Sequence, residues 1–82
     1  MACDKALRML LNHRLRGWKA TRKYGAPVMC QKWIDGEQAA LITSGRHLKQ
    51  GDCETALYAL ENAALYRGKL DSCRDQTAKR RR

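Results

Sequence analysis

The sequence predicts an all-α fold, a small three-helix up-down-up bundle, on the basis of two observations. Helix-favouring Ala, Leu, Lys and Arg dominate a chain that contains one Pro and no Phe among its 82 residues. Apolar residues also recur at steps of three and four along three segments, as expected for helices that each bury one face. A chain of this length forms one domain with a small core, which leaves little room for an enclosed active site.

The first helix is expected from about Cys3 to Tyr24. Its apolar stripe repeats at steps of three and four and comprises Cys3, Leu7, Leu11, Leu15 and Trp18. Lysine and arginine side chains follow the same steps on the opposite side, so this helix has one apolar and one basic face. Gly25 is suited to end the helix, and Pro27 is suited to begin the next one.

The second helix is expected from about Val28 to Lys49, with its buried side at Cys30, Trp33, Ile34, Leu41 and Leu48. Asp35, with Gln38 at the third helical position after it, has the pattern of a helix start. One interpretation therefore breaks this helix near Asp35-Gly36. Gly36 and Gly45 are both unfavourable inside a helix, and they mark either such a break or a close contact between helices.

The third helix is expected to follow a tight turn. Gly51 takes the left-handed conformation that ends the second helix, and Asp52 caps the third. The buried stripe of the third helix is expected to comprise Cys53, Ala56, Leu57, Leu60, Ala63, Ala64, Leu70 and Cys73. We divide the chain into a single helical domain, residues 1–78, and a flexible basic tail, residues 79–82.

The segment from Ala39 to Ala64 resembles one tetratricopeptide repeat. GDCETALYALENAAL matches the second helix of that family at its characteristic steps, namely Gly51, Ala56, Leu60 and Ala63. The first half departs from the family pattern at Ala40, Thr43 and Ser44, and no second copy follows. We interpret the likeness as the same helical hairpin reached independently, whereas kinship would imply a protein-binding module.

The four cysteines do not have the spacing of a zinc site. They lie twenty or more residues apart, whereas zinc modules place their ligands in close pairs, so buried thiols are expected. An up-down-up topology places Cys3 near Cys53 at one end of the bundle and Cys30 near Cys73 at the other. These pairs should remain thiols in a reducing cytosol, and they would be the two disulfides of an exported protein.

No group of residues indicates catalysis. The six glycines stand alone, so there is no Gly-rich phosphate loop, and no nucleophile motif accompanies the cysteines or histidines. We therefore predict a non-enzymatic protein with no metal, no cofactor and no small-molecule substrate. The N-terminus does not resemble a signal peptide and no apolar run is long enough to span a membrane, which predicts a cytoplasmic location without a membrane partner.

The net charge of +9 is concentrated at the two ends of the chain. Residues 1–24 hold seven Lys and Arg against Asp4 alone, and residues 79–82 are all basic. Such segregation favours an acidic partner. The candidate binding residues are six of the seven N-terminal cations, one aromatic residue and the four residues of the basic tail, namely Arg8, Arg14, Arg16, Lys19, Arg22, Lys23, Tyr24, Lys79, Arg80, Arg81 and Arg82.

The leading functional prediction is that the basic first helix docks on nucleic acid or a nucleoprotein complex. Trp18 and Tyr24 are interleaved with cations, a composition found on base-stacking surfaces, although the apolar stripe places Trp18 in the core. The alternative is a regulator or inhibitor whose basic face meets an acidic patch on one target protein, a type common among bacteriophage and mobile-element accessory proteins. The simplest alternative is that the cations only keep the domain soluble, with some of them paired with acids of the third helix.

Overall fold

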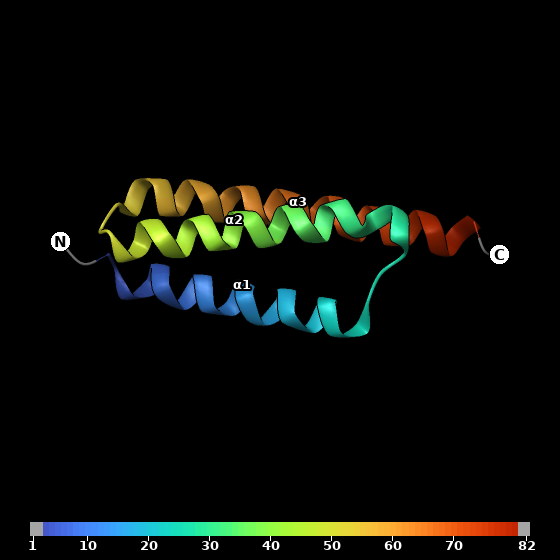
Figure 1. Ribbon diagram of the computed structural model, residues 1–82, viewed down its shortest axis with the longest axis horizontal. Coiled ribbons are helices and arrows are strands. Elements are labelled where there is room, and N and C mark those ends of the chain that lie inside the picture. Colours follow the sequence, from blue (N-terminus) through green and yellow to red (C-terminus); the bar gives the residue numbers. More distant parts are fainter. Residues whose placement is uncertain (1–2, 81–82) are drawn as a thin grey trace.

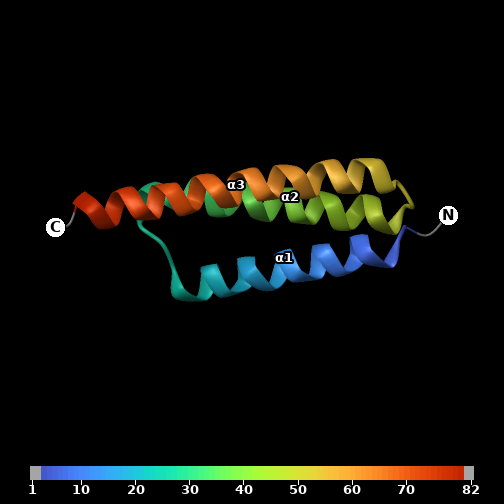
Figure 2. The ribbon, with the colours of Figure 1, turned by 180° about the vertical axis from the view of Figure 1, so that it is seen from behind.

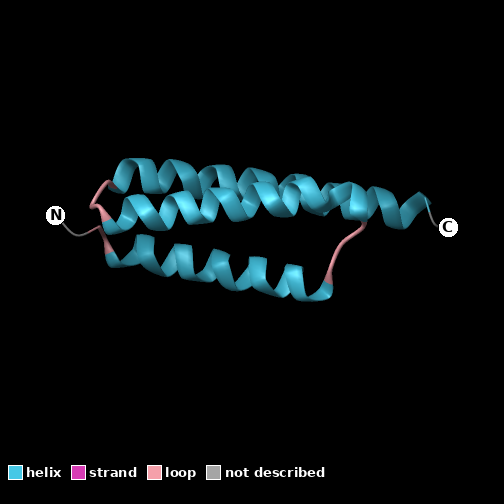
Figure 3. Ribbon diagram, viewed as in Figure 1, coloured by secondary structure: helices cyan, strands magenta, loops and turns pink. Residues whose placement is uncertain are grey.

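The structure is a computed structural model that describes residues 3–80, with side chains described through Thr77. It confirms the all-α three-helix bundle, built from α1 (Lys5–Tyr24), α2 (Gln31–Lys49) and α3 (Cys53–Arg80). One turn of 3-10 helix, η1 (Val28–Cys30), precedes α2. The helices alternate in direction along an elongated body of 52 × 18 × 16 Å, as both views of the ribbon show (Figures 1 and 2). Short loops join them (Figure 3).

Local sequence signals define both ends of α1. Asp4 caps its start, because Oδ1 accepts a hydrogen bond from the backbone N–H of Ala6 at 3.2 Å. Gly25 ends it, as predicted, with a φ of 77° and its own N–H donated to the carbonyl of Thr21 at 2.9 Å. A positive φ is costly for other residues, so glycine is the natural choice at this position.

α2 is continuous, so the interpretation that breaks it near Asp35-Gly36 is wrong. The irregular turn occurs earlier, where Pro27 precedes η1. Gly36 instead marks a close contact between helices, because a Cβ at this position would lie 2.6 Å from Cε1 of Tyr66 in α3. The ring of Tyr66 occupies the space that a side chain at position 36 would need.

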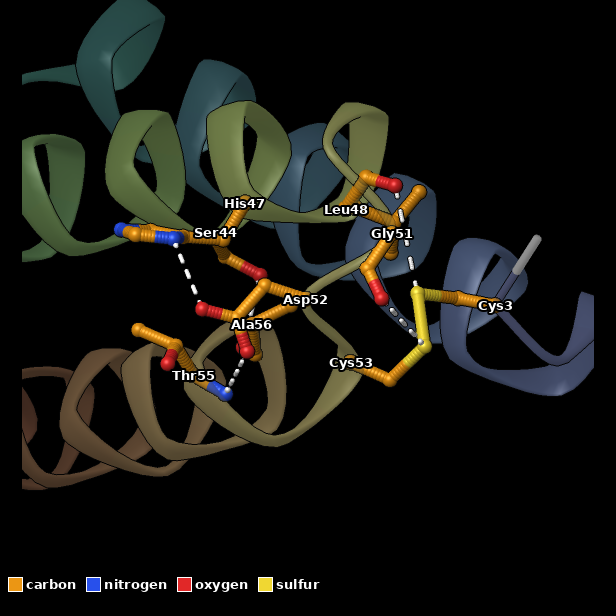
Figure 4. A network of polar contacts seen from close by, with 9 residues as sticks. All are labelled: Cys3, Ser44, His47, Leu48, Gly51, Asp52, Cys53, Thr55 and Ala56. Carbon is orange, nitrogen blue, oxygen red and sulfur yellow. Dashed lines mark hydrogen bonds and ion pairs between the residues drawn. A yellow bond between two sulfur atoms is a disulfide. The ribbon is translucent and has the colours of Figure 1, made fainter. Parts of the chain in front are cut away.

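The turn between α2 and α3 has the predicted geometry (Figure 4). Gly51 has a φ of 80°, and Oδ1 of Asp52 accepts a hydrogen bond from the backbone N–H of Thr55 at 3.2 Å. The buried hydroxyl of Ser44 donates to the carbonyl of Ala56 at 2.8 Å, which ties the end of α2 to the first turns of α3. Small side chains allow the two helices to approach closely here.

The core lies along the α2–α3 contact and is closed on one side by α1. Trp18 is buried, as predicted, and its Nε1–H donates to the carbonyl of Ile34 at 3.2 Å. Leu60 is also buried, but Leu57 is 45 % exposed, contrary to its predicted place in the stripe. Leu57 follows the fully buried Ala56 by one residue, and one residue turns the side chain by about 100° around the helix.

Both predicted cysteine pairings are confirmed, and each pair is bonded as a disulfide, the form that the sequence analysis assigned to an exported protein. Cys3 and Cys53 form one disulfide with a Cα separation of 5.5 Å, and Cys30 and Cys73 form the second at 5.9 Å. All four cysteines are therefore used. The first bond joins the start of α1 to the start of α3, and the second joins η1 to the later part of α3.

α3 is longer than the sequence suggested. Its backbone remains helical to Arg80, so Lys79 and Arg80 of the predicted basic tail continue the helix. Residues with high helix propensity and cations near the helix C-terminus favour this extension. Arg81 and Arg82 lie outside the described residues. No helix within residues 3–80 combines the length and apolar character that a membrane crossing requires.

Candidate functional site

One side of α1 presents a row of exposed cations to solvent. Arg8, Arg16, Lys19 and Lys23 lie along this side at the predicted steps, and all four are exposed. A straight helix rises 1.5 Å per residue, so the row from Arg8 to Lys23 is about 22 Å long. We call these four residues the basic face.

The basic face is not neutralised by the neighbouring helices. Among the side chains of residues 3–77, two ion pairs are formed, between His47 and Asp52 and between Arg67 and Glu37, and neither involves a cation of α1. The alternative that acids of α3 pair with the α1 cations therefore has no support in this part of the chain. Four adjacent cations that no ion pair of the described side chains neutralises attract an anionic surface.

Two further predicted residues lie next to the basic face. The guanidinium of Arg22 is 5.5 Å from the centre of the Trp18 ring, a cation–π contact that holds it over α1. Tyr24, the last residue of α1, is 80 % exposed and makes no part of the core. Both residues extend the candidate binding surface toward the C-terminal end of α1.

Arg14 does not belong to this surface. It is half-buried and lines a small cavity of about 120 Å³ between the helices, together with His13, Gly17, Glu37 and Arg67. Glu37 is 1 % exposed, and its Oε2 lies 3.5 Å from Nε of Arg67. Nη1 of Arg67 also donates a hydrogen bond to the hydroxyl of Thr21. Arg14 thus takes part in a buried charge cluster that the sequence analysis missed.

Burial raises the pKa of Glu37 above its ordinary value of 4.5. The nearby positive charges of Arg67 and Arg14 lower the pKa, and the negative charge of Asp71 raises it, but loss of hydration is the largest effect. A weak signal for this site was visible in the sequence, since Glu37 stands three residues after Ile34 and four before Leu41, on the buried face of α2.

A hollow strip runs between α1 and α2 on the side of Arg8. Two adjoining cavities, of about 550 and 390 Å³, share Leu11, Leu15, Gly45 and Lys49 in their linings. We call this strip the α1–α2 groove. It is lined by residues of both helices and the turn after α2, namely Arg8, Leu11, Asn12, Leu15, Leu41, Ile42, Gly45, Arg46, Leu48, Lys49 and Gln50.

The groove adds functional candidates that the sequence analysis did not select. Arg46 and Lys49 are exposed cations of α2, and the fold brings them to the same groove as Arg8 of α1. Arg46 and Lys49 follow Ile42 by four and seven residues. Residues at this spacing share one face of a helix, so this face was visible in the sequence. What the pattern did not indicate was which face of α2 borders α1.

A second aromatic site lies at the α2–α3 contact. Nζ of Lys32 is 4.8 Å and Nζ of Lys69 is 5.1 Å from the centre of the Trp33 ring. The Tyr66 ring is 6.2 Å from the same ring. The adjacent Lys32-Trp33 pair was the available sequence signal, but Lys69 joins it only through the fold.

The basic tail is described in part. Lys79 and Arg80 are helical in their backbone, whereas Arg81 and Arg82 lie outside the described residues. Because α1 and α3 run in the same direction, the C-terminal ends of both helices point to the same end of the molecule (Figure 1). The end of α3, which includes Lys79 and Arg80, projects beyond the end of α1 at Tyr24 (Figure 1).

Within residues 3–80, no group of three or more His, Cys, Asp or Glu side chains is arranged to hold a metal ion. Comparison of the chain with protein-family models, with curated proteins and with solved structures found no match. The resemblance of Ala39–Ala64 to a tetratricopeptide repeat is therefore not supported by a family match. The site must be interpreted from its own geometry.

Proposed function

We propose that this is a non-enzymatic binding protein whose basic face docks on an acidic surface of a partner protein. One observation carries the proposal: Arg8, at one end of the basic face, lines an apolar groove that has the further cations Arg46 and Lys49 on its α2 side. Cations alone attract any polyanion, but cations around an apolar strip match a protein surface with acidic and apolar side chains. This was the alternative hypothesis from the sequence, and the groove is the reason to prefer it.

Docking on nucleic acid is the second candidate. The observation in its favour is Tyr24, a residue that is 80 % exposed and follows directly after Arg22 and Lys23. An exposed aromatic ring among cations is suited to stack on a base while the cations contact phosphates. The other cations of the basic face and the basic end of α3 would add contacts to the backbone.

The test is affinity purification from the source cells with three versions of the protein. The first is the wild type, and the second carries Arg16→Glu, Lys19→Glu and Lys23→Glu. The matched control carries Lys32→Glu, Lys69→Glu and Arg74→Glu, the same charge change on exposed residues of α2 and α3. We expect the basic-face variant to lose its dominant protein partner and the control variant to retain it.

Nuclease treatment and salt separate the two candidates. A protein partner that survives nuclease and whose association slows with salt supports the first candidate. Binding that disappears with nuclease, with a logarithm of affinity that falls linearly with the logarithm of salt, supports the second. A basic-face variant that folds and retains every interaction contradicts both.

A separate experiment determines the cellular compartment of the protein. The cytoplasmic location predicted from the sequence stays a prediction, whereas two disulfides in so small a chain favour an oxidising compartment. Alkylation of thiols in intact source cells, followed by mass measurement, distinguishes the two. Four alkylated cysteines support the cytoplasm, and four protected cysteines support an oxidising compartment.

A further inference from the structure

The α1–α2 groove is apolar along its floor. Leu11 and Leu41 are buried there, Leu15 is half-buried, and Ile42 is 52 % exposed. Gly45 has no side chain to fill the strip, and a Cβ at that position would meet only Cδ2 of Leu11, at 3.7 Å. Water over such a floor gains few hydrogen bonds, so an apolar side chain that replaces it is stabilised.

The edges of the groove are cationic on both sides. Arg8 stands on the α1 side, and Arg46 and Lys49 stand on the α2 side. No Asp or Glu is among the residues that line the two cavities. The surface that complements this arrangement is apolar in the middle and acidic along both edges.

We propose that the α1–α2 groove receives an amphipathic helix of the partner protein, with apolar residues on the groove floor and Asp or Glu residues beside the two cationic edges. This inference names the kind of partner that the proposed function requires and rests on that function. Helices bind in this way when apolar residues at steps of three and four fill a groove between two helices. The bound helix would lie beside α1 and α2 as a fourth helix of the bundle.

The length of the groove sets the length of the bound segment. The stretch of α1 from Arg8 to Leu15 is about 10 Å long, or two helical turns. Lys19, one turn further along the same side of α1, extends the cationic edge by about 6 Å. A partner segment of about three turns therefore covers the groove, with its acidic residues within reach of Arg8, Lys19 and Lys49.

A protein helix fits this groove better than nucleic acid or a lipid surface. Phosphates of a nucleic acid could bind the cations at the edges of the groove. The leucine and isoleucine side chains of the floor offer them no hydrogen-bond donor. A lipid surface requires apolar side chains that protrude, whereas Leu11 is buried at the bottom of a concave strip. Only an occupant with its own apolar ridge fills the space.

The probe is a synthetic amphipathic peptide of about 18 residues, or five helical turns. It has Leu at steps of three and four and Glu on both sides of the leucine stripe. A scrambled peptide of the same composition keeps the charge and removes the stripe. Fluorescence anisotropy with the disulfide-bonded protein measures both affinities, and we expect the ordered peptide to bind at least about tenfold more tightly than the scrambled one.

Two protein variants form a matched pair for the groove. Ile42→Glu places an acid in the floor, and Leu65→Glu makes the same change at an α3 residue that is 65 % exposed and outside the groove. Far-UV circular dichroism checks that both remain folded. Ile42→Glu should lower the affinity for the ordered peptide about tenfold or more, whereas Leu65→Glu should change it less than about twofold. Equal effects of the two variants, or equal binding of the two peptides, would overturn the proposal.

A second copy of this chain is the competing occupant. α3 has its own exposed acidic and apolar residues, including Glu54, Leu57, Glu61 and Leu65. If the groove receives a foreign helix instead, sedimentation of the protein alone should show a monomer. An oligomer that both Ile42→Glu and Leu65→Glu dissociate would assign the groove to self-association and contradict a foreign helix.

Failure of this inference is distinguishable from failure of the proposed function. If Ile42→Glu keeps the partner captured from cells while the triple reversal at Arg16, Lys19 and Lys23 loses it, the acidic docking stands and the groove proposal falls. If the triple reversal also keeps the partner, the proposed function itself falls.

Discussion

Glu37 and Arg67 form the charged contact at the centre of the bundle, with Oε2 of Glu37 3.5 Å from Nε of Arg67. Neither carboxylate oxygen has a hydrogen-bond partner among the described residues, and the side chain of Glu37 is almost completely buried. For a carboxylate buried in this way, the loss of hydration outweighs the attraction of the nearby cations Arg67 and Arg14. This contact therefore makes the stability of the protein sensitive to pH.

Stability should fall as the pH rises through the titration of Glu37. Burial raises the pKa of Glu37 in the folded protein above 4.5, so the folded state binds the proton more tightly than the unfolded state. The stability that the folded state gains from this tighter proton binding is complete below pH 4.5. It is lost as the pH rises through the pKa that Glu37 has in the folded protein. Glu37→Gln removes this dependence, so wild type should lose stability relative to the variant across that window.

Urea unfolding of wild type and Glu37→Gln at a series of pH values measures the difference. A difference in unfolding free energy that stays constant with pH would contradict the burial of an ionisable group. Arg67→Met is the complementary variant, since it leaves the carboxylate without its cation, and it should cost about 3–5 kcal/mol at neutral pH.

Gly36→Ala should destabilise the protein, although alanine is the better helix former. The new Cβ would lie 2.6 Å from the Tyr66 ring, so α2 and α3 would have to move apart or the ring would have to leave its place beside Trp33. Overpacking of this kind costs about 1–3 kcal/mol.

Gly45→Ala is the matched control in the same helix. Its Cβ would make an ordinary contact of 3.7 Å with Leu11, so the gain in helix propensity should stabilise the protein by up to about 1 kcal/mol. Thermal unfolding of both variants decides the matter. Equal shifts of the melting temperature would mean that Tyr66 does not cover Gly36.

Each disulfide should contribute strongly to stability because each closes a long loop. The bonded cysteines are 50 and 43 residues apart, for which the loss of chain entropy in the unfolded state gives about 4 kcal/mol per bond. Replacing either pair by serine should lower the urea midpoint. Peptide mapping without reduction provides the control, and a Cys3–Cys30 or Cys3–Cys73 link would contradict the up-down-up topology.

Leu60→Ala and Leu57→Ala should differ sharply although the residues are neighbours on α3. Leu60 is 2 % exposed in the core, so its truncation should cost about 2–5 kcal/mol. Leu57 is 45 % exposed, and its truncation should cost well under about 1 kcal/mol. Denaturant midpoints of the two variants measure the difference, and similar midpoints would place the buried side of α3 elsewhere.

Much of the fold was predictable because its causes are local. The steps of three and four define the buried faces, Gly25 and Gly51 occupy positions that need a positive φ, and Asp52 caps the helix that follows. Short connections then require neighbouring helices to run in opposite directions. That topology alone was sufficient to predict both cysteine pairings.

The sequence by itself determined the three helices, their order of direction, the cysteine pairs and the cations on one side of α1. The tertiary structure decided which of those features form a site. A helix has several faces that are equally compatible with its own periodicity, and only packing against a second helix selects the one that is covered. Thus Tyr66 lies over Gly36, Arg14 lines a cavity with Glu37 and is not part of the basic face, and Arg46 and Arg8 line adjoining cavities of one apolar groove. These contacts join residues far apart in the chain, so no local pattern specifies them.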